Sequence, residues 1–309
     1  MSAQIAVHEP SGVLIVNKHA GVTSHDIVGK IRRLYGTRRV GHTGTLDPMA
    51  TGVLVVLIGR AAKASEYLVS DSKRYHAGLR LGLTTDTEDT TGVVLSTHGG
   101  ALPSFAELEE ALPAFRGTIK QVPPMYSALK VGGKKLVDLA RQGVTIERQA
   151  REIEIFSLDA APTNSPADFT LDVCCSGGTY IRTLCADIGA KLGCGGVMSS
   201  LERVEACGFS IDQAHTTEAL EGITPQERES LLIPIEALFS SLPSVRLSPF
   251  FEKLCRSGCE IYQKKIGVSL PLGTRVRICD ESGEFFALGE VKEYESGMAI
   301  KAIKTFALD

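Results

Sequence analysis

The chain of 309 residues carries 33 Lys and Arg against 36 Asp and Glu, a formal net charge of −3, and 43% of its residues are hydrophobic. This length predicts two domains, or a large domain with a smaller one, built around a real core. No run reaches the roughly 18 apolar residues of a spanning helix, and the N-terminus lacks a signal-peptide pattern, so we expect no membrane association.

The eight cysteines form neither a CxxC pair nor a Cys/His array with zinc spacing. We therefore expect reduced thiols, most of them in the core, and a cytoplasmic protein. The slight negative charge is unlike that of a typical nucleic-acid-binding domain. Basic residues nevertheless cluster at 30–39 and 130–151, which fits either solvated helix faces or a nucleic-acid contact.

The first predicted elements are a strand and a helix. Residues 12–18 (GVLIVNK) are short, apolar and β-branched, which indicates a buried strand. Thr23 and Asp26 form a capping-box pattern for a helix that ends near Gly36. A glycine- and threonine-rich loop with an Asp-Pro pair follows at 38–52, before a second apolar strand.

The middle of the chain alternates between strand and helix patterns. Residues 73–83 place apolar side chains on one face, as a half-buried strand does. Ser104 and Glu107 form a second capping box, and its helix carries an apolar stripe to Phe115. The basic, glycine-containing residues 118–151 are interpreted as a protruding insertion.

Two alternating segments, 151–158 and 168–175, predict further strands. The sequence SGGTYIRTLCADIGAKLG then turns into a helix that ends at Gly193, with Tyr180 and Arg182 at the turn. Strands and helices mix without regular βαβ alternation. This mixture predicts an α+β fold with a largely antiparallel sheet.

A domain boundary is predicted near Leu242-Pro243-Ser244. The residues after it read as short strands separated by glycine turns. We therefore expect a domain over residues 1–241 and a small β-rich domain over 242–309.

One constellation of residues points to chemistry. Asp47 before Pro48 is by itself an ordinary turn initiator. Its loop, GHTGTLDPMATGVL at 41–54, however, closely resembles the catalytic loop of the TruB family, the tRNA pseudouridine-55 synthases. Further segments resemble family motifs in the family's order: KRY (73–75), LGLTTDTEDTTG (81–92), PPMYSALKVGGKKL (123–136), GTYIRTL (178–184) and LGCGG (192–196).

The resemblance implies a pseudouridine-synthase core and a reaction without cofactor or metal. By this resemblance Asp47 is the nucleophile, Tyr75 stacks on a flipped uracil, and Arg182 is the ion-pair partner of Asp47. A carboxylate nucleophile must be ionised, and a permanently charged, bidentate arginine favours that state. The target uridine lies stacked in a folded RNA loop, so the enzyme must extrude it.

Other residues receive roles from the same resemblance. His42 is expected to fill the space left by the flipped base, Tyr180 to pack near the uracil and Asp47, and Leu201 to form an apolar wall. Lys18 and the basic insertion are expected to contact phosphates of the tRNA T arm. The TDTEDTTG run is interpreted as a solvated loop without chemistry. No protein partner is implied, and we expect a monomer.

The chain departs from the family pattern at Asn17, His19 and Val137, where Asp, Pro and an aromatic residue are common. None is a predicted catalytic position. Residues 274–291 are similar to small RNA-binding barrels of the PUA type, which predicts a PUA-like C-terminal domain.

Three other functions remain open from the sequence. The chain is compatible with an RNA-binding chaperone that has no chemistry. A nucleotide-binding enzyme is less compatible, because the Gly-Lys-Ser/Thr ending and the Rossmann glycine spacing are absent. A glycosidase would need a second carboxylate near Asp47, and Asp86, Glu88 and Asp89 are candidates.

Overall fold

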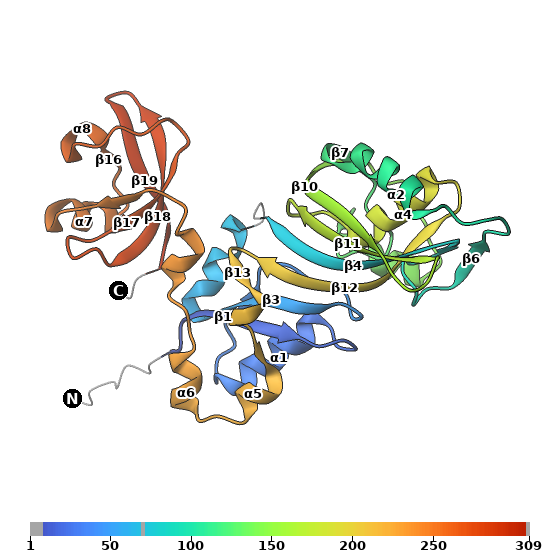
Figure 1. Cartoon of the computed structure of the whole chain (residues 1–309). Helices are drawn as coiled ribbons and strands as arrows, with labels where there is room; N and C mark the ends of the chain where they lie inside the picture. The colour runs from blue at the N-terminus through green and yellow to red at the C-terminus, as the bar shows by residue number, and fades with distance from the viewer. Residues whose placement is uncertain (1–8, 69–71, 307–309) are drawn as a thin grey trace.

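The computed structural model describes residues 9–68 and 72–306 and contains two main sheets (Figure 1). The larger sheet has the strand order β14 (His215–Thr216), β1 (Gly12–Lys18), β3 (Thr51–Ile58), β12 (Gly196–Ala206), β4 (Lys73–Leu81), β11 (Asp168–Cys175), β10 (Arg151–Pro162) and β7 (Gly117–Gln121), with β2 (Val40–His42) paired to β3 and β13 (Phe209–Ser210) to β12.

Helices cover this sheet and connect its strands. They are α1 (Ser24–Leu34), α2 (Phe105–Ala111), α3 (Leu136–Arg141), α4 (Ile181–Lys191), α5 (Thr217–Glu221) and α6 (Pro225–Ser230), with the 3₁₀ helices η1 (Gly59–Tyr67), η2 (Leu112–Phe115), η3 (Ile211–Gln213) and η4 (Ile235–Phe239). β1 pairs with β14 and β3 with β12 in parallel, and the other neighbours in the strand order are antiparallel. The predicted α+β fold with a mixed, largely antiparallel sheet is confirmed.

The strand β1 is buried on both faces, which explains its unbroken apolar run. Val13 and Ile15 pack in a cluster that includes residues of η1 and η4. Leu14 and Val16 pack in a cluster with α1 on the opposite face. The Thr23 capping box of α1 is present, with the Asp26 amide donating to Thr23 Oγ1 at 3.1 Å.

The strand β4 has one buried and one exposed face, as its alternation predicts. Tyr75, Ala77 and Leu79 belong to a buried cluster with residues of α2 and α4. His76 and Arg80 are exposed on the other face. The helix predicted after Ser104 is shorter than its apolar stripe: α2 ends at Ala111 and the chain continues as η2.

The predicted insertion over 118–151 is wrong at both ends. Residues 118–121 belong to β7, and Arg151 opens β10 directly opposite Gln121. β7 (GTIKQ) carries a single large apolar residue, Ile119, which is too little to distinguish a strand from a loop by sequence. The segment outside the sheet is therefore 122–150, which holds α3 and a hairpin of β8 (Lys130–Val131) and β9 (Lys134–Lys135). A second small hairpin pairs β5 (Leu83–Thr85) with β6 (Val94–Thr97).

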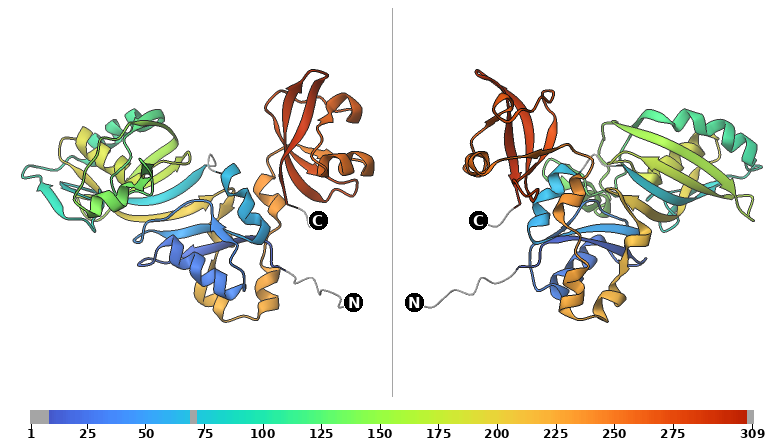
Figure 2. Two further views of the ribbon diagram at one scale, coloured as in Figure 1. Left: turned by 180° about the vertical axis from the view of Figure 1, so that it is seen from behind. Right: turned by 60° about the vertical axis from the view of Figure 1, so that its left-hand side comes forward.

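The C-terminal part forms a separate five-stranded sheet with two short helices. Its strand order is β15 (Ser244–Arg246), β17 (Arg275–Cys279), β18 (Phe285–Tyr294), β19 (Gly297–Thr305) and β16 (Ile261–Tyr262), with α7 (Pro249–Arg256) and α8 (Gln263–Ile266). This β-rich, PUA-like unit agrees with the prediction. Figure 2 shows that it lies beside the N-terminal strands, on the side away from α2 and β10. The boundary after residue 241 stays a prediction.

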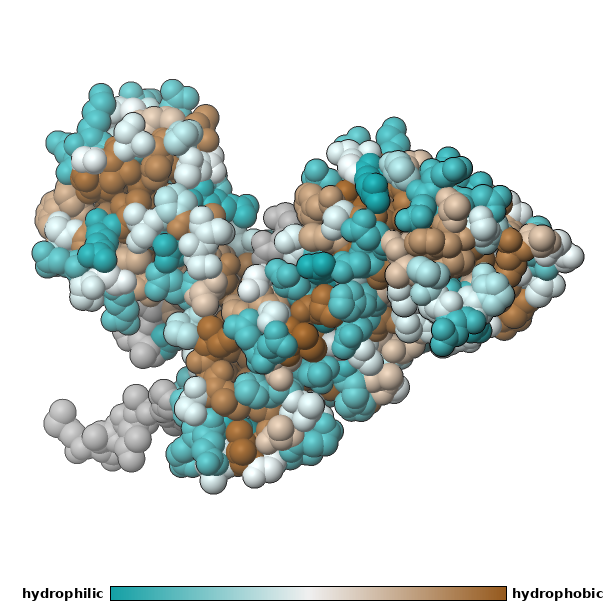
Figure 3. Space-filling view, viewed as in Figure 1, coloured by the Kyte–Doolittle hydropathy of each residue, from teal (hydrophilic) through white to brown (hydrophobic). Residues whose placement is uncertain are grey.

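The surface in Figure 3 is mostly hydrophilic, with separate apolar patches. Of the eight cysteines, six are buried, Cys174 is half-buried and Cys259 is exposed, and all eight are free. Among the helices of the described segments, none combines the length and apolar character that crossing a bilayer requires.

Candidate active site

The loop that carries Asp47 connects β2 to β3 and makes a tight turn. The amide of Ala50 donates to the Asp47 carbonyl at 3.0 Å, so Asp47 does initiate a turn, as its position before Pro48 indicates. The Asp47 side chain is 33% exposed. The Asp47 backbone thus closes the turn, while the side chain takes no part in it and can bind residues outside the loop.

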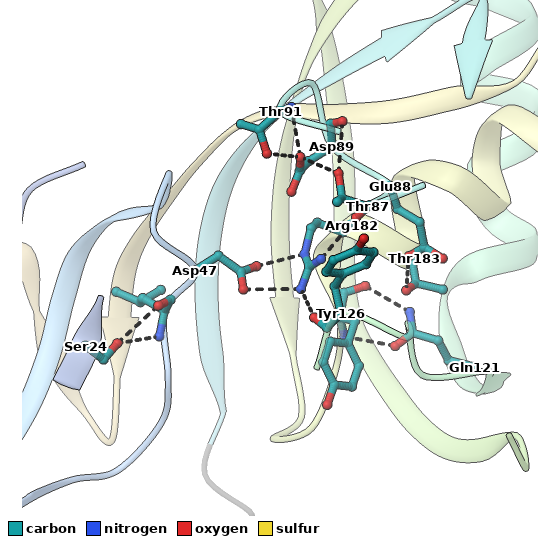
Figure 4. Close-up of polar contacts among 12 residues, drawn as sticks. Ser24, Asp47, Thr87, Glu88, Asp89, Thr91, Gln121, Tyr126, Arg182 and Thr183 are labelled. Carbon is teal, nitrogen blue, oxygen red and sulfur yellow. Dashed lines mark hydrogen bonds and ion pairs between the residues drawn. The ribbon is translucent and has the colours of Figure 1, made fainter. Parts of the chain in front are cut away.

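Ser24, at the start of α1, fixes the residue before Asp47. Its hydroxyl accepts a hydrogen bond from the Leu46 amide at 2.8 Å and donates to the Leu46 carbonyl at 3.1 Å (Figure 4). Ser24 is 1% exposed. The N-terminal side of the Asp47 turn is therefore tied to the first turn of a helix.

Lys18, at the end of β1, fixes the other side of the turn. Its ammonium donates to the carbonyls of Ala50 at 2.5 Å, His19 at 3.1 Å and Pro48 at 3.2 Å. Lys18 is fully buried. The predicted phosphate contact of Lys18 is therefore wrong, because its charge is enclosed under the loop and bound to carbonyl oxygens.

Burial lowers the pKa of Lys18 from 10.5 to about 8, and the nearby negative charge of Asp47 partly opposes that shift. Nothing in the sequence around Lys18 indicated that its side chain would be buried under the loop.

Arg182, on the first turn of α4, forms a two-point ion pair with Asp47. Its Nε lies 2.8 Å from Asp47 Oδ2, and its Nη2 lies 3.2 Å from Oδ1. The Arg182 side chain is 5% exposed. This is the fork geometry in which a guanidinium binds a carboxylate most strongly. The predicted pairing of these two side chains is present.

Two further segments orient the same guanidinium. Arg182 Nη2 donates to the Tyr126 carbonyl at 2.8 Å, and Nη1 donates to the Thr87 carbonyl at 3.0 Å (Figure 4). Asp47, Thr87 and Tyr126 lie in three of the segments that resemble family motifs. One buried arginine therefore joins segments that are far apart in the sequence.

The TDTEDTTG loop is more than a solvated turn, and that interpretation needs correction. Asp89 is 5% exposed, and its Oδ1 accepts hydrogen bonds from Thr87 Oγ1 and from the amide and hydroxyl of Thr91 at 2.6–2.9 Å. Asp89 thereby shapes the turn that presents the Thr87 carbonyl to Arg182. The Asp- and Thr-rich sequence indicates a turn, but it does not indicate that the Thr87 carbonyl binds Arg182.

Tyr75 and Leu201 lie on neighbouring strands in one apolar cluster with Leu46 and Ala50. These last two residues flank Asp47 in the loop. Tyr75 is 7% exposed and Leu201 8%. Burial raises the pKa of the Tyr75 hydroxyl, and the charge of Asp47 acts in the same direction. The phenol therefore stays protonated.

Tyr180 is the residue before α4 and is fixed through its backbone. Its amide donates to Gln121 Oε1 at 2.9 Å, and its carbonyl accepts from Gln121 Nε2 at 3.0 Å. Burial raises the pKa of the Tyr180 hydroxyl, with a smaller contribution from the negative charge of Asp47. The expected role of Tyr180 near the uracil and Asp47 stays a prediction.

His42 ends β2 and is half-buried, opposite Val56. Burial lowers the pKa of its imidazole, and the charges of Arg203 and His25 act in the same direction, so the ring is neutral. Its Nδ1 is buried without a hydrogen-bond partner among the described residues. Within the described part of the chain His42 and Asp47 share no hydrogen bond or ion pair, and a role for His42 towards RNA stays a prediction.

Arg203 is a site residue that the sequence analysis missed. It is 1% exposed, and it donates to the carbonyls of Val53 at 2.7 Å and Gly44 at 3.0 Å. Its positive charge also opposes the pKa shift of Tyr75. A Cβ at Gly52 would lie 2.3 Å from the Arg203 carbonyl oxygen, so this approach requires glycine.

The acidic residues considered for a glycosidase are all bound elsewhere. Asp86 accepts from the Tyr126 hydroxyl at 3.2 Å, and Glu88 accepts from the Thr183 hydroxyl at 2.5 Å. Asp89 is committed to its own turn. The carboxylate of Asp47, in contrast, is paired with Arg182.

The loop offers fewer amides to a phosphate than its glycine-rich sequence indicates, because several of them are already bonded. Leu46 donates to Ser24 and Thr43 donates to the Val55 carbonyl.

Family models match most of the chain. Residues 32–181 match the TruB family pseudouridylate synthase N-terminal domain, and residues 182–240 match the tRNA pseudouridylate synthase B C-terminal domain. The chain belongs to the TruB family of pseudouridylate synthases. The two models meet between Ile181 and Arg182, so the Asp47–Arg182 pair joins both matched regions.

Curated relatives agree over most of their length. A protein named tRNA pseudouridine synthase B from Syntrophotalea carbinolica is 45% identical over 77% of this chain and 78% of its own. One of the same name from Clostridium perfringens is 38% identical over 95% of this chain and 98% of its own. A Neisseria meningitidis relative is 40% identical over 95% of this chain and 94% of its own.

Among solved structures, the Cbf5 chain of a Cbf5-Nop10-Gar1 complex has a TM-score of 0.73 and 24% identity, covering 96% of this chain and 85% of its own. A Nop10-Cbf5 complex gives a TM-score of 0.69 at 22% identity, covering 99% of this chain and 89% of its own. At this identity the likeness concerns the fold alone. It supports the α+β core with a PUA-like C-terminal unit.

Proposed function

We propose that this protein isomerises the uridine at position 55 in the T loop of tRNA to pseudouridine, with Asp47 as the nucleophile. The family and the names of the curated relatives support tRNA pseudouridine synthesis. The position in the tRNA, the nucleophile and base flipping are the finer parts of the proposal.

The observation that carries the proposal is the ion pair of Asp47 and Arg182. A carboxylate acts as a covalent nucleophile in its ionised form. The buried guanidinium is fixed by three segments and holds the Asp47 carboxylate through two atoms. The cost of burying Arg182 is offset because the described contacts occupy its Nε, Nη1 and Nη2 atoms.

The reaction rearranges one nucleotide with no net gain or loss of atoms. The N1–C1′ bond of uridine breaks, the uracil turns, and a C5–C1′ bond forms. The proton on C5 is released and N1 takes up a proton. Asp47 assists either by adding to the uracil ring or by bonding to C1′, and both routes remain compatible with its position. The detached uracil must be retained throughout, which the apolar cluster of Tyr75 and Leu201 favours.

The uridine must leave its stack to reach Asp47. Tyr75 offers the new stacking surface, Leu201 an apolar wall, and Tyr180 an aromatic side chain near the nucleophile. His42 is a candidate to occupy the vacated space. Because Tyr75 is only 7% exposed, we expect the flipped base to enter edge-first against its ring.

The exposed lysines of segment 122–150 are candidates for phosphate contacts. Lys130, Lys134 and Lys135 gather on the β8–β9 hairpin and are exposed. Replacing them should weaken tRNA binding and flatten its salt dependence, since each phosphate contact releases counterions.

The test is pseudouridine mapping on an unmodified tRNA transcript, with wild-type protein and Asp47→Ala. We expect pseudouridine at position 55 with wild type, none with Asp47→Ala, and similar tRNA affinity for both. Asp86→Ala is the matched control, because Asp86 is exposed and bonded to Tyr126 rather than to Arg182. Tight binding without modification by wild type would favour an RNA chaperone and refute the enzyme proposal.

A further inference from the structure

Gln121, the last residue of β7, is a buried amide bonded to a single residue of the site. It is 2% exposed. Its Oε1 accepts the Tyr180 amide at 2.9 Å, and its Nε2 donates to the Tyr180 carbonyl at 3.0 Å (Figure 4). Both hydrogen bonds go to the backbone of Tyr180, two residues before the arginine that pairs with Asp47.

We infer that Gln121 is a positioning residue that sets the direction of the Tyr180 ring for the reaction. The inference rests on the proposed function. It adds a residue that does not touch the reacting atoms and acts through Tyr180.

The geometry explains why one amide suffices. In an antiparallel sheet, facing residues exchange two N–H···O bonds. The planar Gln121 amide reproduces that exchange for Tyr180, at a point where the chain has left β11 and has not yet entered α4. Holding both backbone groups of Tyr180 restricts its φ and ψ, and the backbone dihedrals in turn restrict the staggered χ1 positions that the ring can adopt.

The location of Tyr180 makes this support necessary. Tyr180 is the N-cap of α4, and its side chain makes no capping hydrogen bond to the helix, while its carbonyl also accepts the Leu184 amide at 3.0 Å. It lies two residues after Gly178, which adopts a φ of +88° that favours glycine. Arg182 lies two residues further on, already fixed by its own three partners. The Tyr180 amide, in contrast, donates to the side chain of Gln121, so this end of the turn depends on Gln121.

The chain contains a matched control for this pair of bonds. Gln263, in the C-terminal unit, is 4% exposed, and its amide makes the same two bonds to the backbone of Leu270, at 2.6 and 3.0 Å. Gln121→Met and Gln263→Met each remove one such amide at nearly constant side-chain length. They differ in whether the bonded residue belongs to the site.

The experiment compares single-turnover rates on tRNA transcript at saturating enzyme, tRNA affinity and thermal unfolding for the full chain. We expect Gln121→Met to react about 10- to 100-fold more slowly with nearly unchanged affinity, because small misplacements near reacting atoms have effects of that size. Gln263→Met should lose similar thermal stability and keep its rate. Equal rates in Gln121→Met and wild type would overturn the inference.

A double-mutant cycle tests whether Gln121 affects the reaction through the Tyr180 ring. Tyr180→Ala removes the ring and keeps both backbone groups that Gln121 binds. In that background Gln121→Met should cause no further loss, whereas an equal loss in both backgrounds would refute action through Tyr180. If Tyr180→Ala has no measurable rate, the two glutamine variants alone decide.

Gln121→Glu covers the case in which Gln121→Met fails to fold. It keeps the acceptor for the Tyr180 amide and loses the donor, so a partial loss of rate is expected, and a wild-type rate overturns the inference. An inactive wild type would instead refute the proposed function, which separates the two failures.

Discussion

The Asp47–Arg182 pair shows how much of the site depends on the shape of one side chain. A guanidinium offers donors in a rigid plane. Here Nε and Nη2 bind Asp47, Nη2 also donates to the Tyr126 carbonyl, and Nη1 donates to the Thr87 carbonyl. A lysine ammonium at the same place would keep the charge but could not reach all these acceptors.

Arg182→Lys should therefore lower the single-turnover rate by on the order of 10², through misalignment of Asp47, while tRNA binding changes little. Arg80→Lys is the control, since Arg80 also binds a carboxylate through two atoms, at 2.7 and 3.2 Å from Asp168, on an exposed face. A fully active Arg182→Lys variant would show that the fork geometry is unimportant.

The burial of Lys18 leads to a prediction about how the free energy of unfolding depends on pH. Its pKa is about 8 in the folded chain against 10.5 ordinarily, because burial disfavours the charge. Between these values the unfolded chain holds the proton that the folded chain has released, so the unfolded state binds more protons. The free energy of unfolding from this group therefore rises as pH increases from about 8 to about 10.5.

The measurement is urea unfolding of wild type and Lys18→Met at pH 7, 8.5 and 10. Subtracting the two series removes the titration of all other groups. We expect the stability of wild type relative to Lys18→Met to increase with pH across this window. A flat difference would mean that Lys18 titrates normally.

At the scale of elements, the Asp47 loop is fixed by the strand and the helix that precede it in the chain. Lys18 ends β1 and Ser24 begins α1, and between them they bind backbone atoms of Leu46, Pro48 and Ala50. The loop is thus shaped by side chains that lie outside its own sequence.

Ser24→Ala should lower the free energy of unfolding by about 1–3 kcal/mol, because the buried Leu46 amide loses its partner. The reaction rate should fall as well, since the loop next to Asp47 loosens. Thr224→Ala serves as the control, because it removes a helix cap from α6 by deleting one hydroxyl away from the site. Chemical denaturation and single-turnover rates measure both effects, and an unchanged rate in Ser24→Ala would contradict the prediction.

At the scale of the whole molecule, the two sheets share one apolar cluster. Phe306 and Leu288 of the C-terminal part pack with Val55, Leu57 and residues of η1 and η4. Polar contacts reinforce the junction, with Tyr67 donating to the Ile303 carbonyl at 3.2 Å. The C-terminal unit is therefore expected to unfold together with the N-terminal part.

Phe306→Ala should lower the free energy of unfolding by about 3–5 kcal/mol, as for other buried aromatic residues, and should shift one cooperative calorimetric transition of the full chain. Phe306 is 4% exposed, whereas Phe250 is 67% exposed and supplies the control, because Phe250→Ala leaves no cavity. If the calorimetric trace of Phe306→Ala showed a second, separate unfolding transition at lower temperature, the C-terminal part would be an independent domain.

The sequence alone determined the elements whose signals are local. The apolar run of β1, the alternation of β4 and the capping boxes at Thr23 and Ser104 depend on contacts within a few residues, and all are present. The Asp47 loop and the Arg182 helix were identified differently, by the resemblance of contiguous motifs to those of a known family.

Tertiary structure decided what depends on residues far apart in the chain. Whether residues 118–121 form a strand depends on pairing with β10, about thirty residues later. The enclosure of Lys18, the use of the Thr87 carbonyl by Arg182, and the bonds of Gln121 to Tyr180 join segments 30 to 95 residues apart. A sequence displays which donors and acceptors exist, but only the folded chain determines which of them are brought within hydrogen-bonding distance.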